Sequence, residues 1–217
     1  MTSLAGPRTG VGHVTAAIVD QLAVRPDVSL VAYAVTRDRS IGSALRLPPG
    51  VPLRVTGLPA RGLFEAWRRT SRPRIERWTG RVDVVHGTNF VVPPSHGGEL
   101  VTVHDTAFAR RPDLVTADSR RYGALVRAAL ARGAVVHVFS DSVRDEVLDA
   151  FGCPPDRVVR IHPGVAPTAG GDAARGRRLA GADRYVLALG TVEPRKNYPR
   201  LVEAFDRVVA THPGLRL

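Results

Sequence analysis

The sequence predicts an α/β fold with a doubly wound parallel sheet, and three features of the chain support this prediction. Short apolar runs, each of a length typical of a strand buried on both faces, recur at residues 82–86, 100–104, 135–139 and 158–161. Helical patterns at 119–131 and 142–151 separate the later runs, as expected for strands in a parallel sheet. Polar residues directly follow several runs, where such a sheet places its ligand crevice.

The first predicted elements are a helix and a strand. Residues 12–23 have helical periodicity, with a predicted buried face formed by Val14, Ala17, Ile18 and Leu22. Pro26 closes this segment, and the apolar run 28–35 predicts a buried strand. The nine residues before Gly10 are too polar and broken to supply a strand ahead of the helix.

The next stretch is punctuated by proline and glycine. Residues 47–59 predict an irregular connection. A short helix is expected around Leu63, Phe64 and Trp67, and Pro73 interrupts the pattern before Ile75 and Trp78.

Domain boundaries follow from a change in composition after residue 166. Residues 1–166 predict one domain, and residues 167–183, rich in Gly, Ala and Arg, predict a linker with a short helix. The pattern then restarts in residues 184–217, where we expect a strand at 185–189, a helix at 199–211 and the beginning of another strand at 215–217.

Composition excludes several classes of protein. The chain has 217 residues, 44% of them hydrophobic, which is enough to bury a core. It has no apolar run near the roughly 20 residues of a membrane helix, and its start lacks the apolar core of a signal peptide. Cys153 is the only cysteine, so an internal disulfide is impossible, and no Cys/His spacing typical of zinc sites occurs. We therefore expect no metal and a cytoplasmic protein.

The basic excess points to an anionic partner or simply to a solvated surface. There are 31 Lys+Arg against 20 Asp+Glu, a formal net charge of +11, and Lys196 is the only lysine. An anionic membrane surface, a phosphorylated substrate and nucleic acid all suit this charge. Without aromatic residues interleaved among the basic ones, the sequence disfavours nucleic acid.

Glycines and polar residues mark four candidate sites. Gly10 and Gly12 precede a predicted helix, whose free N–H groups favour an anion, although a turn without a ligand fits equally well. His104 and Asp105 end one predicted strand, where the carboxylate could orient the imidazole ring, and His86 ends the preceding strand. After the third strand, Ser140 is either a helix N-cap, a substrate contact or both.

The fourth site is the loop after the restarting strand. Gly190 begins it, and Arg195 and Lys196 place adjacent positive charges before the next helix. Such a pair can neutralise a diphosphate, with arginine as a bidentate donor and lysine as a point charge.

In this order, five segments resemble the retaining glycosyltransferases of family 4, whose two facing Rossmann-like domains form the GT-B arrangement. The segments are TGVGHV, VDVVHGTNFVVPP, VTVHDTAF, VFSDSVRDEVLDAFGCPPDRVVRIHPGV and LALGTVEPRKNYPRLVEAF. The resemblance implies transfer of a sugar from a nucleotide-diphosphate donor with retention, and no cofactor. The donor would be held mainly by the C-terminal domain and the glycan or lipid-linked acceptor by the N-terminal one.

The resemblance also implies roles for single residues. The family's glycine loop falls on Gly10 and Gly12, its strand-end histidine on His104, and its basic site for the donor diphosphate on Lys196. Many relatives have an arginine at the position of Thr191, so Arg195 either supplies the missing charge or points elsewhere.

Relatives begin with a strand before the glycine loop and continue through a complete donor domain with paired glutamates, so we expect this chain to be truncated at both ends and inactive alone. A fragment, a misassigned reading frame and a piece of a longer polypeptide all fit. Within the family, the chain resembles bacterial enzymes that build cell-surface or lipid-linked glycans, which suits a basic face touching the anionic inner surface of the membrane. The alternative is a glycosyltransferase-like module that binds an acceptor or partner without catalysis.

Overall fold

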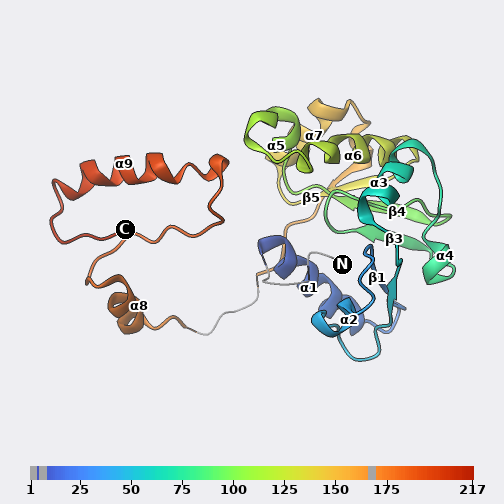
Figure 1. Cartoon of the computed structure of the whole chain (residues 1–217), viewed down its shortest axis with the longest axis horizontal. Helices are drawn as coiled ribbons and strands as arrows, with labels where there is room; N and C mark the ends of the chain where they lie inside the picture. The colour runs from blue at the N-terminus through green and yellow to red at the C-terminus, as the bar shows by residue number, and fades with distance from the viewer. Residues whose placement is uncertain (1–3, 5–8, 166–169) are drawn as a thin grey trace. The chain divides into compact units, whose positions relative to one another are not determined.

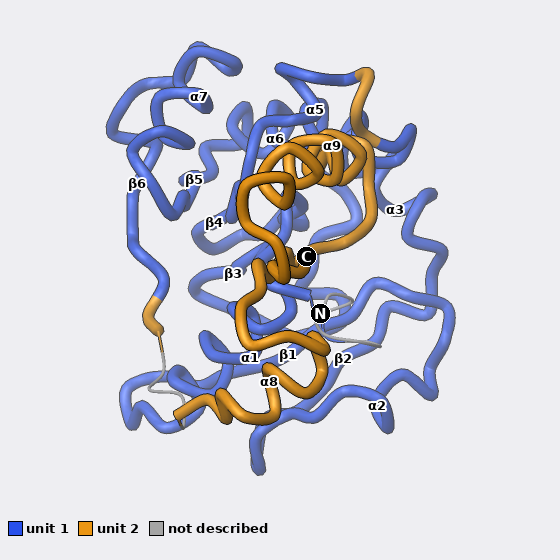
Figure 2. Tube along the Cα trace, turned by 90° about the vertical axis from the view of Figure 1, so that its left-hand side faces the viewer, with its two compact units in different colours: residues 1–112, 116–163 blue, residues 113–115, 164–217 orange. Residues whose placement is uncertain are grey.

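The structure is a computed structural model that describes residues 4, 9–165 and 170–217. The chain divides into two compact units (Figures 1 and 2). The first unit contains residues 1–112 and 116–163, and the second contains residues 113–115 and 164–217. The domain bounds expected from the sequence, 1–166 and 184–217 with a linker between them, remain a prediction.

The first unit alternates strands and helices as the apolar pattern predicts. Its strands are β1 Ala32–Ala34, β2 Leu53–Val55, β3 Val84–Gly87, β4 Gly98–Thr102, β5 Val135–Val138 and β6 Val158–Arg160. Its helices are α1 Gly10–Ala23, α2 Ile41–Ala44, α3 Ala60–Arg69, α4 Glu76–Thr79, α5 Ala107–Arg110, α6 Tyr122–Ala131 and α7 Asp141–Phe151. Its short 3-10 turns are η3 Ser119–Arg121 and η4 Pro155–Arg157, and a further turn, η2 Pro112–Leu114, lies mostly in residues 113–115 of the second unit.

All strand pairs in the described residues are parallel, and they form two sheets. β3, β4, β5 and β6 lie side by side in chain order, which confirms the strands predicted at 82, 100, 135 and 158. β1 pairs with β2 in a separate two-stranded sheet. The irregular connection expected at 47–59 was wrong in part, because β2 forms within it by pairing Leu53 with Ala32.

The core of the larger sheet consists mainly of valines. Val101 on β4 is in register with Val136 on β5, and both are completely buried. α7 adds the fully buried Val147. Burial is uneven at the margins: Val84 is 63% exposed and Val159 is 42% exposed, so β3 and β6 are not buried on both faces as expected.

The first helix confirms the predicted element but not its face. α1 buries Gly12, Thr15, Ala16 and Val19, whereas Ala17 of the predicted face is exposed. The predicted and the observed buried residues both recur at helical spacing, so spacing by itself does not decide which face is buried. Thr15 is buried in place of a larger apolar residue, which periodicity by hydrophobicity does not detect.

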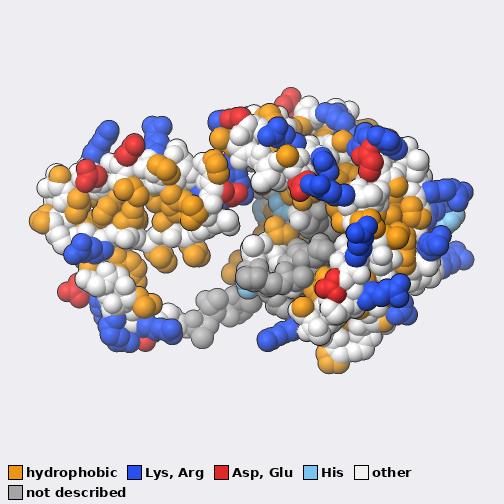
Figure 3. Space-filling model, viewed as in Figure 1, with side chains coloured by type: hydrophobic (Ala, Val, Ile, Leu, Met, Phe, Trp, Pro, Cys, Tyr) orange, Lys and Arg blue, Asp and Glu red, His pale blue; other side chains and the backbone are white. Residues whose placement is uncertain are grey.

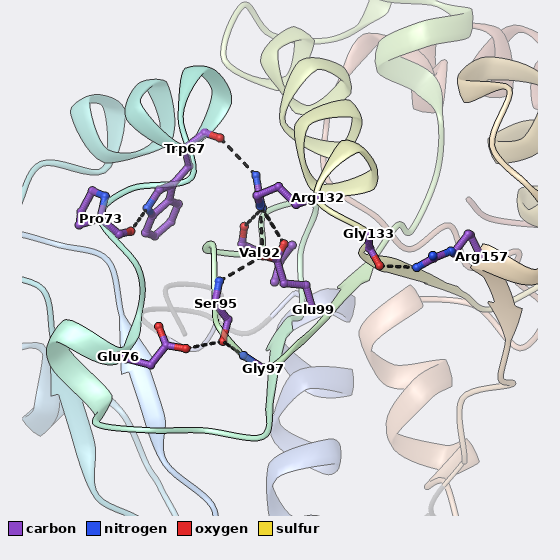
Figure 4. Close-up of polar contacts among 10 residues, drawn as sticks. All are labelled: Trp67, Pro73, Glu76, Val92, Ser95, Gly97, Glu99, Arg132, Gly133 and Arg157. Carbon is purple, nitrogen blue, oxygen red and sulfur yellow. Dashed lines mark hydrogen bonds and ion pairs between the residues drawn. The ribbon is translucent and has the colours of Figure 1, made fainter.

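A buried ion pair joins three elements of the first unit (Figure 4). The Arg132 guanidinium donates to both carboxylate oxygens of Glu99 at 3.0–3.1 Å from its Nε, and the two side chains are only 12% and 7% exposed. Arg132 also donates to the carbonyls of Trp67 and Val92, and Ser95 N donates to Glu99. These contacts satisfy both charges, which a buried pair requires.

The second unit contains α8 Ala173–Ala180, η5 Pro194–Lys196 and α9 Tyr198–Val209. α8 is the short helix expected in the linker, capped by Asp172 and ended by Gly181 in a left-handed conformation. The strand expected at 185–189 was wrong: only Tyr185 forms a bridge, with Arg216. No described residue of this unit is buried, so a strand there has no sheet or helix to pack against.

Candidate functional site

The carboxyl edge of the four-stranded sheet gathers the polar residues predicted from the strand ends. His86 lies in β3, His104 follows β4 by two residues, and Ser140 follows β5. Because the strands are parallel, their carboxyl ends meet at one edge. The rings of His104 and Phe139 are 5.3 Å apart, so the segments after β4 and β5 do lie together.

His104 is held by a backbone carbonyl and aromatic rings. Its Nε2 lies 2.9 Å from the Thr88 carbonyl oxygen, and its ring packs edge-on against Phe90 at 5.7 Å. A carbonyl only accepts hydrogen bonds, so Nε2 carries the hydrogen. Burial lowers the pKa of His104 despite the opposing effects of the Thr88 hydrogen bond and the Asp105 charge. His104 is therefore a neutral ring with Nδ1 left as an acceptor.

A chain of hydrogen bonds crosses the sheet from β3 to the end of β6. His86 Nε2 lies 2.8 Å from Thr102 Oγ1, which lies 3.0 Å from His137 Nδ1. His137 Nε2 in turn lies 3.2 Å from the Ile161 carbonyl oxygen. Thr102 and His137 are in register on adjacent strands, so their side chains share one face of the sheet.

The carbonyl at one end of this chain fixes the direction of every bond in it. Ile161 can only accept, so His137 carries its hydrogen on Nε2 and its Nδ1 accepts from the Thr102 hydroxyl. The Thr102 oxygen then accepts from His86 Nε2. His86, like His104, is left with Nδ1 as a hydrogen-bond acceptor.

Burial keeps all three imidazoles of this region neutral. It lowers the pKa of His86 to about 4, with smaller contributions from His137 and His104. It also lowers the pKa of His137, against the hydrogen bond to Ile161. In His86 and His104, Nδ1 forms no hydrogen bond with any residue that the structure describes, so each neutral ring can accept from a hydroxyl group there but has no proton to give from that nitrogen at neutral pH. The edge is chemically suited to recognising a hydroxylated molecule.

Asp105 does not orient His104 as the sequence suggested. Its Oδ1 accepts from Ala107 N at 3.0 Å, at the start of α5, and the Thr88 carbonyl orients the ring instead. The short Asp side chain is satisfied by the nearest free N–H of its own turn. The Asp105 charge still favours a protonated His104 from a distance.

Ser140 is the N-cap of α7. Its Oγ accepts from Val143 N at 3.2 Å, and its backbone is extended, as a cap requires. The N-cap interpretation of Ser140 is confirmed, and the substrate contact stays a prediction.

Gly10 and Gly12 lie within the first turn of α1, not in a loop before it. The helix begins at Gly10, and His13 N bonds to the carbonyl of Thr9 at 2.9 Å. Gly12 is buried, and Gly10 is exposed with open space where a side chain would lie. The helix N-terminus still directs backbone N–H groups outward, and its first turn has no acidic side chain.

In the second unit, Gly190 and Lys196 lie close to each other. A Cβ placed on Gly190 would lie 2.9 Å from the Tyr198 hydroxyl and 3.9 Å from Lys196 Cε. Arg195, by contrast, pairs with Glu193 at 2.9 Å. Lys196 forms no ion pair within the part of the chain that the structure describes. The two basic residues predicted to act together therefore differ: the Arg195 charge is paired with a carboxylate, and the Lys196 charge has no such partner among the described residues.

The described residues contain neither a cluster of metal-ligating side chains nor a helix suited to cross a membrane. In residues 4, 9–165 and 170–217, no group of three or more His, Cys, Asp or Glu side chains is arranged to hold a metal ion. Within the same ranges, every helix is too short or too polar to cross a membrane.

Sequence reasoning missed the residues that support the histidines. Thr88, Thr102 and His137 were not singled out, because the first two are common strand-end residues and His137 lies inside an apolar run. The available signal was the alternation of β5: a histidine between valines in VVHV has to share a face with its partner on the next strand.

Comparisons with known proteins converge on one enzyme family. The model of Glycosyltransferase Family 4 matches residues 8–169. The chain is 29% identical over 155 residues to O-antigen chain mannosyltransferase B of Escherichia coli, covering 66% of this chain and 40% of that protein. It is 30% identical over 241 aligned positions to D-inositol 3-phosphate glycosyltransferase of Acidothermus cellulolyticus, covering 97% of this chain and 53% of that protein. The chain spans about half the length of the curated relatives that it matches.

Proposed function

Because the chain belongs to glycosyltransferase family 4, we propose that it forms the acceptor-side domain and the beginning of the donor-side domain of a sugar transferase. The donor is a nucleotide-diphosphate sugar, the acceptor is a glycan or lipid-linked molecule, and the transfer proceeds with retention. Residues 1–166 hold the acceptor, and residues 184–217 contribute to the donor site. The mannosyltransferase among the relatives makes a mannosyl donor the first to test.

The observation that carries the proposal is the pair of neutral histidines at the carboxyl edge of the sheet. His86 and His104 each have Nε2 committed to a partner within the protein and Nδ1 left as an acceptor. Sugars present many hydroxyl donors, and correctly placed acceptors fix their orientation. The lowered pKa values favour hydroxyl binding over acid catalysis by these two residues.

Lys196 supplies the positive charge for the donor diphosphate in this proposal. It is unpaired within the described chain, whereas the Arg195 charge is partly neutralised by Glu193. A positively charged side chain beside the leaving diphosphate stabilises the negative charge that develops there in the transition state. Arg195 is therefore the weaker candidate for the donor site.

The direct test is an assay of two proteins: the 217-residue chain and the polypeptide encoded when the flanking genomic DNA is included. We expect sugar transfer from the longer polypeptide and none from the 217-residue chain. Turnover by the short chain with any nucleotide sugar would contradict the proposed division of the two substrate sites. A longer polypeptide that binds acceptor but transfers nothing would favour the non-catalytic binding module.

Matched substitutions in the active protein separate the proposed roles. Lys196→Ala should weaken donor binding by about 1.5–3 kcal/mol, the value of one charge-assisted phosphate contact, while Arg195→Ala should change it less. His104→Ala should lower turnover with little effect on nucleotide binding. Equal effects of the Lys196 and Arg195 variants on donor affinity would sink the assignment of the diphosphate to Lys196.

Thr102 acts through His86 in this scheme and is a positioning residue. Thr102→Val removes the hydroxyl that accepts from His86 Nε2, so the ring loses its fixed tautomer and the acceptor KM should rise. Thr102→Ser keeps the hydroxyl and should restore KM. Long-range ¹H–¹⁵N spectra of the imidazoles report the tautomer of His86 directly, whether or not the protein is active.

A further inference from the structure

An arginine-lined hollow lies at the edge of the sheet opposite to the histidines. It is built from the segment that enters α4 and the turn that precedes β4. The histidines follow or end β3 and β4, and this hollow precedes them, so the two sites are separated by about one strand, roughly 15 Å. It is therefore a separate site from the one proposed for sugar transfer.

The backbone around the hollow is anchored to the core (Figure 4). Trp67 Nε1 donates to the Pro73 carbonyl at 2.8 Å, and Ile75 N donates to the Pro94 carbonyl at 2.9 Å. Trp67 and Ile75 are 2% and 0% exposed. Glu76 Oε1 accepts from Ser95 Oγ at 2.7 Å, which ties the two segments together. The walls of the hollow are thus fixed before any ligand arrives.

The lining is strongly positive. The hollow has a volume of about 690 Å³ and is lined by Arg72, Pro73, Arg74, Glu76, Arg77 and His96. Within the described ranges, none of its three guanidinium groups forms an ion pair, whereas Arg68 and Arg69 on the neighbouring α3 both pair with Glu65. Figure 3 shows basic side chains gathered over α4 at the right-hand edge of the first unit.

Two polar atoms in the hollow lack a hydrogen-bond partner among the described residues. Arg74 Nη1 lies 2.5 Å from His96 Nδ1 and 2.6 Å from His96 Nε2. A neutral imidazole has one acceptor nitrogen, so at most one of these two contacts is a hydrogen bond that Arg74 donates. Arg74 Nε is buried without a hydrogen-bond partner among the described residues, as is Glu76 Oε2. Glu76 Oε1 accepts from Ser95 Oγ and His96 N, and this single carboxylate can offset only one of the three arginine charges.

We propose that this hollow binds a phosphate group carried on a larger molecule. Phosphate oxygens accept several hydrogen bonds at once, and guanidinium groups match their geometry in a bidentate manner. A bound phosphate would give Arg74 Nε its missing acceptor. The volume exceeds that of a bare phosphate and falls in the range of small-molecule sites, which leaves room for the rest of the ligand.

Titration of the 217-residue chain with inorganic phosphate at constant ionic strength tests the site. We expect saturable binding by calorimetry that falls about tenfold or more in Arg74→Gln, the loss expected when a charge-assisted contact is removed. The double variant Arg72→Gln/Arg77→Gln should show a similar loss. Arg46→Gln/Arg120→Gln removes the same charge from exposed positions outside the hollow and should bind like the unmodified chain.

Equal phosphate binding by the pocket and control double variants, or no saturable binding by the unmodified chain, would overturn the proposal. A circular dichroism melt of each variant identifies any loss of folding. If Arg74→Gln does not fold, Arg74→Lys replaces it, because lysine keeps the positive charge but cannot form the bidentate contact of a guanidinium.

Vesicles distinguish a lipid headgroup from a soluble phosphate compound. Vesicles of phosphatidylcholine with one quarter phosphatidylglycerol should bind the unmodified chain, and inorganic phosphate should displace it, if the phosphate belongs to a lipid. Vesicle binding that is the same in the pocket variants assigns the hollow to a soluble phosphate compound. Neither result depends on sugar transfer, so failure here leaves the proposed enzyme function untouched.

Discussion

The two units contain similar apolar runs that end in different structures. In the first unit, the run 135–139 contains the strand β5 Val135–Val138, which is paired on both sides and has Val136 and Val138 completely buried. In the second unit, residues 185–189 form a single bridge, and Leu187 and Leu189 are 76% and 93% exposed. Of the exposed large apolar residues in the described chain, most belong to the second unit (Figure 3). An apolar run becomes a strand only when neighbouring strands and helices cover it.

Hydrogen exchange should show the largest difference between the units. Amides of β4 and β5 are expected to exchange only on global unfolding, which for a domain of this kind costs about 5–15 kcal/mol. Amides of residues 186–192 lack ladder bonds and should exchange with almost no protection, apart from Val186, whose N–H is bonded to the Arg216 carbonyl. Comparable protection in the two units, measured by NMR or mass spectrometry, would contradict the comparison.

Ion pairs provide a second test. Arg132→Ala leaves Glu99 buried without its partner and should lower the free energy of unfolding by about 3–5 kcal/mol. In the second unit, Arg178 lies 4.0 Å from Asp172 with both side chains exposed, so Arg178→Ala should cost less than about 1 kcal/mol. Urea unfolding followed by tryptophan fluorescence measures the Arg132 variant, since Trp67 and Trp78 lie in the first unit, and far-UV circular dichroism, which includes the signal of α8, measures the Arg178 variant.

The stability of the first unit should also depend on pH through its histidines. The pKa of His86 is about 4 in the folded chain against an ordinary 6.5, and the pKa values of His104 and His137 are lowered as well. The unfolded chain therefore binds protons below pH 6.5 that the folded chain does not. Stability is fully present above pH 6.5 and is lost as the pH falls toward 4, by at most about 3 kcal/mol for His86.

Urea titrations at several pH values between 7 and 4.5 measure this loss. His86→Gln should flatten part of the profile, because glutamine does not titrate in this range. A profile that is equally steep without His86 would show that the histidine is not held neutral by the fold.

The smallest effect is expected for an exposed apolar residue. Leu189→Ser removes a side chain that is 93% exposed, so the free energy of unfolding should change by less than about 0.5 kcal/mol. Val147→Ala at a fully buried position of α7 is the matched comparison and should cost more, because it leaves a cavity in the core. Thermal melts of the two variants rank them, and equal shifts would mean that Leu189 is covered in solution.

Local sequence rules were sufficient for elements with strong signals. The four strands of the larger sheet, α6 and α7 follow from their apolar spacing. Ser140 caps the start of α7 and Gly152 its end, as residues of these types usually do. The strand-end positions of His86 and His104 were also predictable, because a parallel sheet gathers the carboxyl ends of its strands.

Tertiary structure decided what depends on neighbours distant in the sequence. The sequence by itself determined the parallel α/β class, the family and the histidines at the sheet edge. It did not determine that β2 would form in a Pro/Gly-rich connection, or that residues 185–189 would form a single bridge in place of a strand. It also left open which group would orient His104 and that His137 would fix the tautomer of His86. A strand needs a partner to satisfy its backbone, and a histidine takes its tautomer from whichever carbonyl or hydroxyl the packed sheet places beside it.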